Sequence, residues 1–207
     1  MVSKLTFGGR ADWLAARKNR VGGSECAALV GMHPYTDNVR LWLQKTWQEP
    51  PPAVDNDAVR YGAAAEEHIR VLFALDHPEY VVTHADNAMV INDRYPFAHA
   101  SLDGELIDQN DRLGVLEIKT GQIGAKWRGK VPDNYYCQLL WYLAVTEYDF
   151  AVLRAYLRTP GDDTIMRDYY IDRADVEGDI AELMGAGERF WHYVQTGQRP
   201  PLILPAV

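Results

Sequence analysis

Leu116-Glu117-Ile118-Lys119 lies in a stretch, residues 113–119, whose alternating apolar and charged side chains predict a half-buried β-strand. Successive side chains of a strand point to opposite faces, so Leu116 and Ile118 should face one way and Glu117 and Lys119 the other. An acid and a base are thereby held side by side on the polar face of the strand. The apolar face needs a covering layer, so the stretch predicts a sheet packed against other elements.

The segments around this strand predict an alternation of helices and further strands. Helices are expected at 10–19, 24–30, 38–46, 56–75, 133–147 and 173–196, and strands at 80–84, 87–92, 97–102, 105–108, 113–119, 149–158 and 165–171. This order indicates the α/β or α+β class, with a mixed central β-sheet flanked by helices. We expect one domain over residues 1–207, with an N-terminal helical region at about 9–50 that ends at a proline-rich loop.

The net charge of −8 argues against a general nucleic-acid-binding protein. The charge is uneven, because residues 1–60 contain 8 Lys/Arg and 6 Asp/Glu, whereas residues 61–207 contain 13 and 23. Basic side chains cluster in two places: Arg10, Arg17, Lys18 and Arg20, and then Lys119, Lys126, Arg128 and Lys130. Ordinary surface charge would explain both clusters equally well, so any contact with DNA should be local.

Several classes of protein are disfavoured by what the chain lacks. It has no apolar run long enough to cross a membrane and no signal-peptide core, so we expect a soluble, cytoplasmic protein without a membrane partner. Its two cysteines, Cys26 and Cys137, exclude a four-cysteine cluster and should be free thiols in that compartment. The six histidines lack metal-ligand spacing, and the absence of a P-loop argues against ATP dependence.

Three acids and a lysine form the candidate catalytic set. Asp103 lies fourteen residues before Glu117 in a dipeptide typical of turns, and a turn could bring both carboxylates to the same end of a sheet. Glu66 lies on the expected helix 56–75 among apolar neighbours, where an unpaired charge is costly. Carboxylates that share a divalent metal ion, with Lys119 beside them, suit phosphodiester cleavage.

Each of these residues also has a plainer interpretation. Glu66 could form an i,i+4 salt bridge with Arg70, worth about 0.2–0.5 kcal/mol. Asp103 could belong to an ordinary turn, and the charges of Glu117 and Lys119 could simply make an exposed strand face soluble. The order of an acid-bearing helix, an Asp-Gly pair, a Glu-x-Lys strand and a glutamine-bearing helix favours the catalytic interpretation.

Polar side chains on two further segments are candidates for DNA contacts. Gln138 and Tyr142 occupy positions i and i+4 of the expected helix 133–147, where they could reach a phosphate or a base, or merely border core aromatic residues. Arg20 and Ser24 flank a pair of glycines before a helix, where backbone N–H groups could approach a 5′-phosphate. Ser24 could instead be only an N-cap.

From about residue 17 to 158 the chain resembles the phage-lambda exonuclease family, the viral-recombinase branch of the PD-(D/E)xK nucleases. The likeness is carried by five segments in order: residues 20–31 with His33-Pro34-Tyr35, residues 61–66 (aromatic-Gly-x3-Glu), Ser101-Leu102-Asp103-Gly104, Leu116-Glu117-Ile118-Lys119, and residues 135–138 with 144–146. Two departures stand out. Leu102 replaces the usual proline, and Leu140 stands where many relatives carry a second glutamine, so Gln138 serves alone or that polar contact is lost.

The resemblance implies a restriction-endonuclease-like core and a Mg²⁺-dependent deoxyribonuclease, with Mn²⁺ as a substitute. Such an enzyme degrades one strand of linear duplex DNA processively from 5′ to 3′, leaving 3′ single-stranded overhangs for a single-strand-annealing recombinase. It also implies a homotrimeric ring, which would hold DNA without a strongly basic surface.

On this hypothesis each candidate residue has a role. The metal ligands are Glu66, Asp103, Glu117 and the backbone carbonyl of Ile118, and Lys119 orients or deprotonates the attacking water or neutralises developing charge. Arg20 and Ser24 grip the 5′-phosphate, while Gln138 and Tyr142 position the strand. The alternatives are a site- or structure-specific endonuclease and a non-catalytic DNA-end-binding protein.

Overall fold

The computed structural model describes residues 1–50, 56–124, 127, 129–161 and 163–204. Its centre is a five-stranded sheet in the order β3-β6-β7-β8-β9. The strands are β3 (Val81–Thr83), β6 (Gly104–Ile107), β7 (Leu113–Gln122), β8 (Phe150–Arg158) and β9 (Thr164–Asp172). The β7–β8 pair is parallel and the other three pairs are antiparallel, which confirms the predicted mixed sheet.

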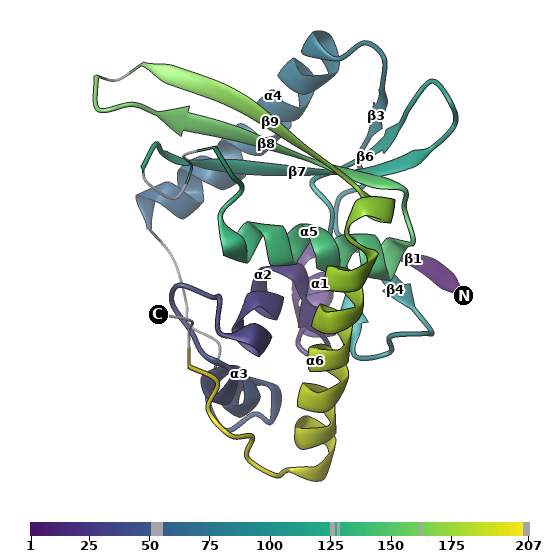
Figure 1. The fold of residues 1–207 in the computed structure, drawn as a ribbon, viewed down its shortest axis with the longest axis vertical. Helices are drawn as coiled ribbons and strands as arrows, with labels where there is room; N and C mark the ends of the chain where they lie inside the picture. Colours follow the sequence, from purple (N-terminus) through teal and green to yellow (C-terminus); the bar gives the residue numbers. More distant parts are fainter. Residues whose placement is uncertain (51–55, 125–126, 128, 162, 205–207) are drawn as a thin grey trace.

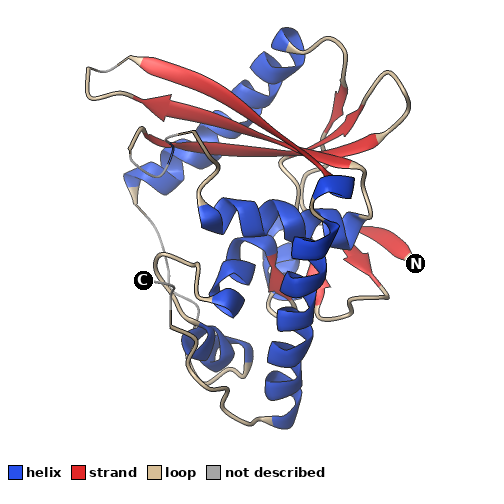
Figure 2. Ribbon diagram, viewed as in Figure 1, coloured by secondary structure: helices blue, strands red, loops and turns tan. Residues whose placement is uncertain are grey.

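Helices cover both faces of this sheet (Figures 1 and 2). Helix α5 (Asp133–Thr146) lies between β7 and β8 in the chain, as a parallel pair requires a crossover, and packs on one face. Helix α4 (Asp57–Asp76) packs on the other face, where its Ile69 and Phe73 share a core with Leu116 and Ile118. Val115 belongs to the core on the α5 side, so the alternation predicted for β7 is confirmed.

The predicted polar face of β7 is covered rather than exposed. Glu117 points to the α5 side, where its side chain is 1% accessible to solvent. The interpretation of Glu117 as a solubilising surface charge is therefore wrong, because a carboxylate covered on both sides cannot serve solubility.

The N-terminal helices lie below α5 in Figure 1, beside the long helix α6 (Glu177–Thr196). Three predicted helices are found here as α1 (Arg10–Arg17), α2 (Gly23–Cys26) followed by the 3-10 helix η1 (Ala27–Val30), and α3 (Asn38–Lys45). Asn56 caps α4 by accepting a hydrogen bond from the backbone N–H of Val59 at 3.0 Å. No helix in the described part of the chain is long and apolar enough to span a membrane.

Two short strands are absent from the sequence prediction. Strand β1 (Val2–Thr6) pairs antiparallel with β4 (Ala88–Asn92), and β2 (Val21–Gly22) pairs parallel with β5 (Ala98–His99). Each pairing joins segments more than 70 residues apart in sequence, and such long-range pairing leaves little trace in a local pattern.

The strand expected at 97–102 is reduced to β5, and the last helix starts later than predicted. A 3-10 turn, η3 (Arg173–Asp175), precedes α6. Asp103 and Gly104 do not form the predicted turn either, because Gly104 starts β6 and pairs with Leu116. The reversal between β6 and β7 lies at residues 108–112, where Asp111 has a left-handed φ of 59°.

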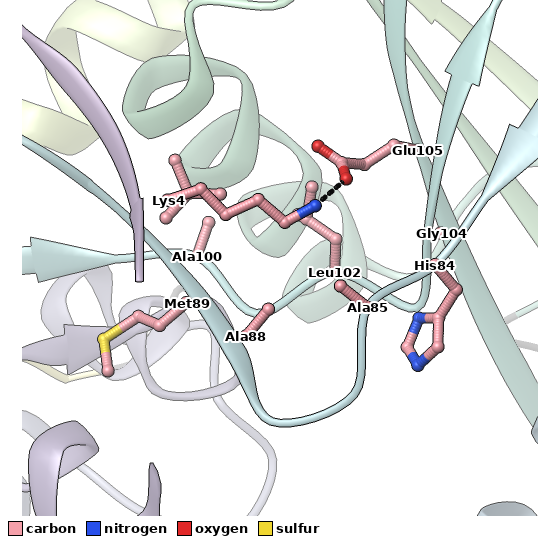
Figure 3. Close-up of a pocket in the computed structure, with 10 residues that line it drawn as sticks. Lys4, His84, Ala85, Ala88, Met89, Ala100, Leu102, Gly104 and Glu105 are labelled. Carbon is pink, nitrogen blue, oxygen red and sulfur yellow. Dashed lines mark hydrogen bonds and ion pairs between the residues drawn. The ribbon is translucent and has the colours of Figure 1, made fainter. Parts of the chain in front are cut away.

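A small cavity of about 10 Å³, close to the start of β6, lies where the β1–β4 strand pair contacts the five-stranded sheet (Figure 3). Lys4 of β1 donates to Glu105 of β6, and the hydroxyl of Tyr148 donates to the other oxygen of the same carboxylate. This contact holds the β1–β4 strand pair beside the start of β6, which follows Asp103.

Candidate functional site

Three carboxylates from three different elements meet at the centre of β7. Glu117 lies in β7 itself, Asp103 precedes β6, and Glu66 lies on α4. Asp103 is held against β7 by a hydrogen bond of 2.8 Å from the backbone N–H of Ile118 to its Oδ2. The charges of all three acids act on one another, because Asp103 and Glu66 both raise the pKa of Glu117. The folded chain thus brings together the three acids predicted from the sequence.

Arg70 joins two of these elements and is absent from the predicted site. Its Nη1 donates to the backbone carbonyl of Asp103 at 2.6 Å and lies 3.4 Å from Glu66 Oε1. The plainer interpretation of Glu66, an i,i+4 pair with Arg70, is therefore correct as a contact, but the stronger bond of Arg70 goes to the Asp103 segment. Arg70 fixes α4 to the approach of β6. Glu66 and Asp103 consequently keep their relative positions.

Glycine at position 62 sets the spacing between α4 and the sheet. A Cβ at this position would lie 3.1 Å from Oγ1 of Thr120 on β7. The helix therefore approaches β7 closely one turn before Glu66, which accounts for the glycine in the aromatic-Gly-x3-Glu segment.

The acids are held in surroundings that disfavour their charge. Burial, followed by the charge of Asp103, raises the pKa of Glu66 to about 7 and that of Glu117 to about 8. Burial also raises the pKa of Asp103. A nearby divalent cation would remove this conflict by favouring the ionised carboxylates, and carboxylate oxygens are the ligands that Mg²⁺ prefers.

Lys119 supplies the local positive charge. Its ammonium donates to Oε1 of Glu117 and lies 5.1 Å from the ring centroid of Tyr135. Burial lowers the pKa of Lys119, but the carboxylates of Glu117 and Asp103 outweigh burial, so the pKa is raised overall. In these surroundings Lys119 is held as a cation beside Glu117.

One oxygen of Glu117 lacks a partner. Oε1 accepts from Lys119 and from Nε2 of Gln138, whereas the buried Oε2 has no hydrogen-bond partner among the described residues. An unpaired buried carboxylate oxygen is costly, and it fits a site for a cation. Within the described residues the side chains as they lie do not form a finished cluster of three metal ligands. The metal set Glu66, Asp103, Glu117 and Ile118 therefore stays a prediction.

Gln138 and Tyr142 belong to a hydrogen-bond network that orients Glu117, and they do not face a DNA strand. Nε2 of Gln138 donates to Glu117 Oε1 at 2.6 Å and to the hydroxyl of Tyr142 at 2.9 Å. Both side chains are buried on α5, so neither offers a surface for DNA. The prediction that they position the strand directly is corrected, because α5 faces the core here. Leu140, which stands where many relatives carry a second glutamine, is also buried. The polar contact of α5 with Glu117 therefore comes from Gln138.

The glycine pair at the start of α2, the N-cap Gly22 and the first residue Gly23, has a packing role. A Cβ on Gly22 would lie 2.7 Å from Nε2 of His99, and one on Gly23 would lie 2.4 Å from Cε1 of Tyr142. The N–H of Gly22 donates to Oε2 of Glu25 at 2.9 Å, so it is not free for an anion. The expected phosphate cradle of backbone N–H groups is corrected at Gly22, and Gly23 instead fixes the distance between α2 and Tyr142.

Replacement of Gly23 by alanine should destabilise the fold by about 1–3 kcal/mol, because the added methyl group overlaps the Tyr142 ring. Denaturant unfolding monitored by circular dichroism measures this change. Gly178→Ala on α6 is the matched control, since a Cβ there meets nothing within 4 Å and helical alanine is favoured over glycine. Equal stabilities of the two variants would show that Tyr142 is not held as described.

A groove of about 1000 Å³ connects Ser24 with Lys119. Ser24 is exposed and is not the N-cap of α2, a position that Gly22 occupies. Arg20 does not line the groove; its carbonyl accepts from Lys45 at 2.7 Å, and its Nε is buried without a partner among the described residues. The structure thus places Ser24 on the groove of Lys119, whereas Arg20 is not among the residues that line it.

Three further basic residues line the groove, and none of them was predicted from the sequence to contact DNA. They are Arg17, Lys18 and Lys45, and the last is ion-paired with Glu25 at 2.8 Å. In the second basic cluster Lys126 and Arg128 lie outside the described residues, and Lys130 is exposed and paired with Asp133 at 2.9 Å. Arg17 and Lys18 already belonged to the first cluster of the sequence, but only the fold shows that they face Lys119 across one groove.

The sequence profile of the YqaJ-like viral recombinase domain matches residues 12–149, which span every element of the site. The chain belongs to this family. Among curated proteins it is similar to the uncharacterized protein YqaJ of Bacillus subtilis (strain 168), with 25% identity over 206 residues. The alignment covers 98% of this chain and 62% of that relative, so the chain spans less than two thirds of the relative's length.

Solved structures share the fold of this YqaJ-like chain. An alkaline exonuclease, LHK-Exo, from Laribacter hongkongensis matches with a TM-score of 0.65 and 20% identity over 91% of this chain and 94% of that one. A phage-related exonuclease from Haemophilus somnus 129PT matches with a TM-score of 0.60 and 13% identity over 86% and 96%. LHK-Exo has also been solved in complex with dAMP. The resemblance to the viral-recombinase branch of nucleases is thereby confirmed at the level of family and fold.

Proposed function

We propose that this chain is a metal-dependent exonuclease that degrades one strand of linear duplex DNA processively from 5′ to 3′ and leaves 3′ single-stranded overhangs. The observation that carries the proposal is the meeting of Glu66, Asp103 and Glu117 around Lys119, with one buried oxygen of Glu117 unpaired in the described chain. The names of the solved relatives, two of them exonucleases, support the same reaction class.

The acids are suited to hold Mg²⁺, or Mn²⁺ in its place, together with the backbone carbonyl of Ile118. When bound, such an ion supplies stabilisation of the charge that develops on the phosphate and lowers the pKa of water. The N–H of Ile118 donates to Oδ2 of Asp103 and so fixes this carboxylate beside β7, which leaves Oδ1 for a metal ion. Gln138 keeps the Glu117 carboxylate in place through one oxygen and leaves the second available.

Lys119 is positioned to neutralise negative charge at the reacting phosphate. It is anchored on Glu117 and lines the groove that a strand would enter. A preorganised cation in a site partly closed to water stabilises a charged transition state more than it would in bulk solvent. Lys119 can also orient the attacking water through its N–H groups.

We assign the 5′-phosphate to the segment of Arg20 and Ser24. Arg20 Nε, Ser101 Oγ and both ring nitrogens of His99 are buried without hydrogen-bond partners in the described chain. The backbone of His99 pairs with that of Gly22 through β5 and β2, so the His99 ring lies beside the segment that carries Arg20 and Ser24. A phosphate bound at this segment would satisfy the unpaired Nε of Arg20, and hydrogen bonds from a charged donor to phosphate are stronger than those from a neutral one.

Partners and assembly follow from the same proposal. A 5′-to-3′ exonuclease that leaves 3′ overhangs prepares the substrate of a single-strand-annealing recombinase. A homotrimeric ring around the DNA would retain it despite the net charge of −8. Size-exclusion chromatography with light scattering measures the subunit number.

Linear duplex DNA labelled at one 3′ end, with 5′-phosphate or 5′-hydroxyl termini, tests the reaction beside covalently closed circular DNA. We expect Mg²⁺-dependent release of mononucleotides from linear DNA alone, faster with the 5′-phosphate, and release of the 3′ label last. Cleavage of the circle would replace the proposal by an endonuclease. Binding to ends without cleavage in Mg²⁺ or Mn²⁺ would replace it by a DNA-end-binding protein.

A further inference from the structure

Trp47 is the exposed tryptophan of the described chain. Its side chain is 65% accessible to solvent, and its backbone has a left-handed φ of 62°. Bulky residues rarely adopt this conformation, because their Cβ crowds the backbone there. An aromatic side chain that is both exposed and attached to strained backbone calls for an explanation other than packing.

The end of helix α3 explains the backbone conformation but not the choice of residue. Thr46 follows the last residue of the helix, and Trp47 N–H then donates to the carbonyl of Gln44 at 3.2 Å. Gln48 N–H donates to the carbonyl of Leu43 at 2.9 Å. The position after such a helix end favours glycine, which closes this turn without strain. The indole is therefore not needed to end the helix.

The groove of Lys119 gives the indole its surroundings. Trp47 lines this groove together with Ser24, Lys119, Arg17 and Lys18. The ammonium of Lys18 lies 5.6 Å from the ring centroid of Trp47, and the guanidinium of Arg17 lies 4.4 Å from that of Trp13. In the described part of the chain, neither Arg17 nor Lys18 has a carboxylate partner. Cations beside an exposed aromatic ring form the combination that binds single-stranded nucleic acid.

We propose that Trp47 stacks on an unpaired nucleobase of the DNA strand that lies in the groove, while Arg17 and Lys18 contact its phosphates. The inference rests on the proposed function and names the form of DNA that the site takes. Bases within a duplex are already stacked and paired, so the indole can reach only a base at a frayed end or in a single strand. Trp47 is thus a positioning residue that holds the strand opposite Lys119.

Binding of a fluorescein-labelled single-stranded oligonucleotide, measured by anisotropy in EDTA, tests the stacking contact without interference from cleavage. Trp47→Gly should bind about 5–150-fold more weakly than the unchanged chain, the range for loss of one base–aromatic stack. Its melting temperature should be unchanged or higher, because glycine suits the left-handed position. Trp47→Phe should keep most of the affinity. Tyr35→Ala, which removes an exposed aromatic residue outside the groove, should bind normally.

Abasic nucleotides placed one at a time along the oligonucleotide locate the stacked base. One position should weaken binding to the unchanged chain by the same factor as Trp47→Gly, and the glycine variant should be insensitive to an abasic nucleotide there. Equal affinity of Trp47→Gly and the unchanged chain, or additive losses at every position, would overturn the stacking contact. If the unchanged chain binds the oligonucleotide but cuts no DNA, the proposed exonuclease activity is overturned. Weaker binding by Trp47→Gly would in that case still support the stacking contact.

Discussion

Lys119→Ala should lower the rate of DNA cleavage by at least about 10²–10³-fold at saturating DNA, while end binding stays close to that of the unchanged chain. The ammonium of Lys119 is held by Glu117 at the groove where the phosphate would lie, so its loss removes charge at the reacting centre. On the proposed function the strand contacts several basic residues along the groove, so the loss of one phosphate contact should change the total affinity little. Single-turnover cleavage of 5′-phosphorylated linear duplex, with binding measured separately in EDTA, separates the two effects.

Lys130→Ala is the matched control, because Lys130 is an exposed lysine paired with Asp133 and lies outside the groove. Its cleavage rate should be unchanged. Lys119→Arg keeps the charge and should restore part of the rate if neutralisation is the role of this side chain. Cleavage by Lys119→Ala at the original rate would remove Lys119 from the site.

Glu117→Gln should abolish the stabilisation that Mg²⁺ or Mn²⁺ gives to the fold, together with cleavage. At 100 times its dissociation constant, a ligand of the folded state contributes about 2.7 kcal/mol, which for a chain of this size corresponds to a rise of about 5–10 °C in melting temperature. The unchanged chain should show such a rise and Glu117→Gln none, because the glutamine cannot supply the unpaired anionic oxygen. Differential scanning fluorimetry with and without metal measures it.

The pH dependence of the metal-free chain gives this prediction a second measurement. Because burial and Asp103 raise the pKa of Glu117 from 4.5 to about 8, the folded state holds more protons than the unfolded state in that interval. Stability should therefore fall as the pH rises from about 4.5 to about 8, and Glu117→Gln should flatten the fall. Metal affinity should rise over the upper part of the same range, as the acids ionise.

Glu67→Gln is the control for the carboxylate variant. Glu67 follows Glu66 on α4 but is exposed, so its replacement should leave the metal response unchanged. A normal rise in melting temperature for Glu117→Gln would show that the ion binds elsewhere.

The sequence by itself determined most of the secondary structure and the members of the acidic site. The alternation over residues 113–119 placed Leu116 and Ile118 on one face of β7 and Glu117 and Lys119 on the other, as the structure has them. Periodicity is a local property, so it survives in the sequence without knowledge of the fold. Asp103 and Glu66 were identified because each lies in a segment with a recognisable pattern.

Only the tertiary structure decided what the second face of β7 contacts. Helix α5 covers Glu117, turns Gln138 and Tyr142 inward and leaves one carboxylate oxygen unpaired, and none of this is visible in the period of the strand. Arg70 likewise acquired its role through a contact with Asp103, 33 residues away. Long-range contacts depend on how elements pack, which the spacing of residues within one element does not encode. The sequence therefore named the acids, and the packing of α4 and α5 around β7 determined their charge, their exposure and their neighbours.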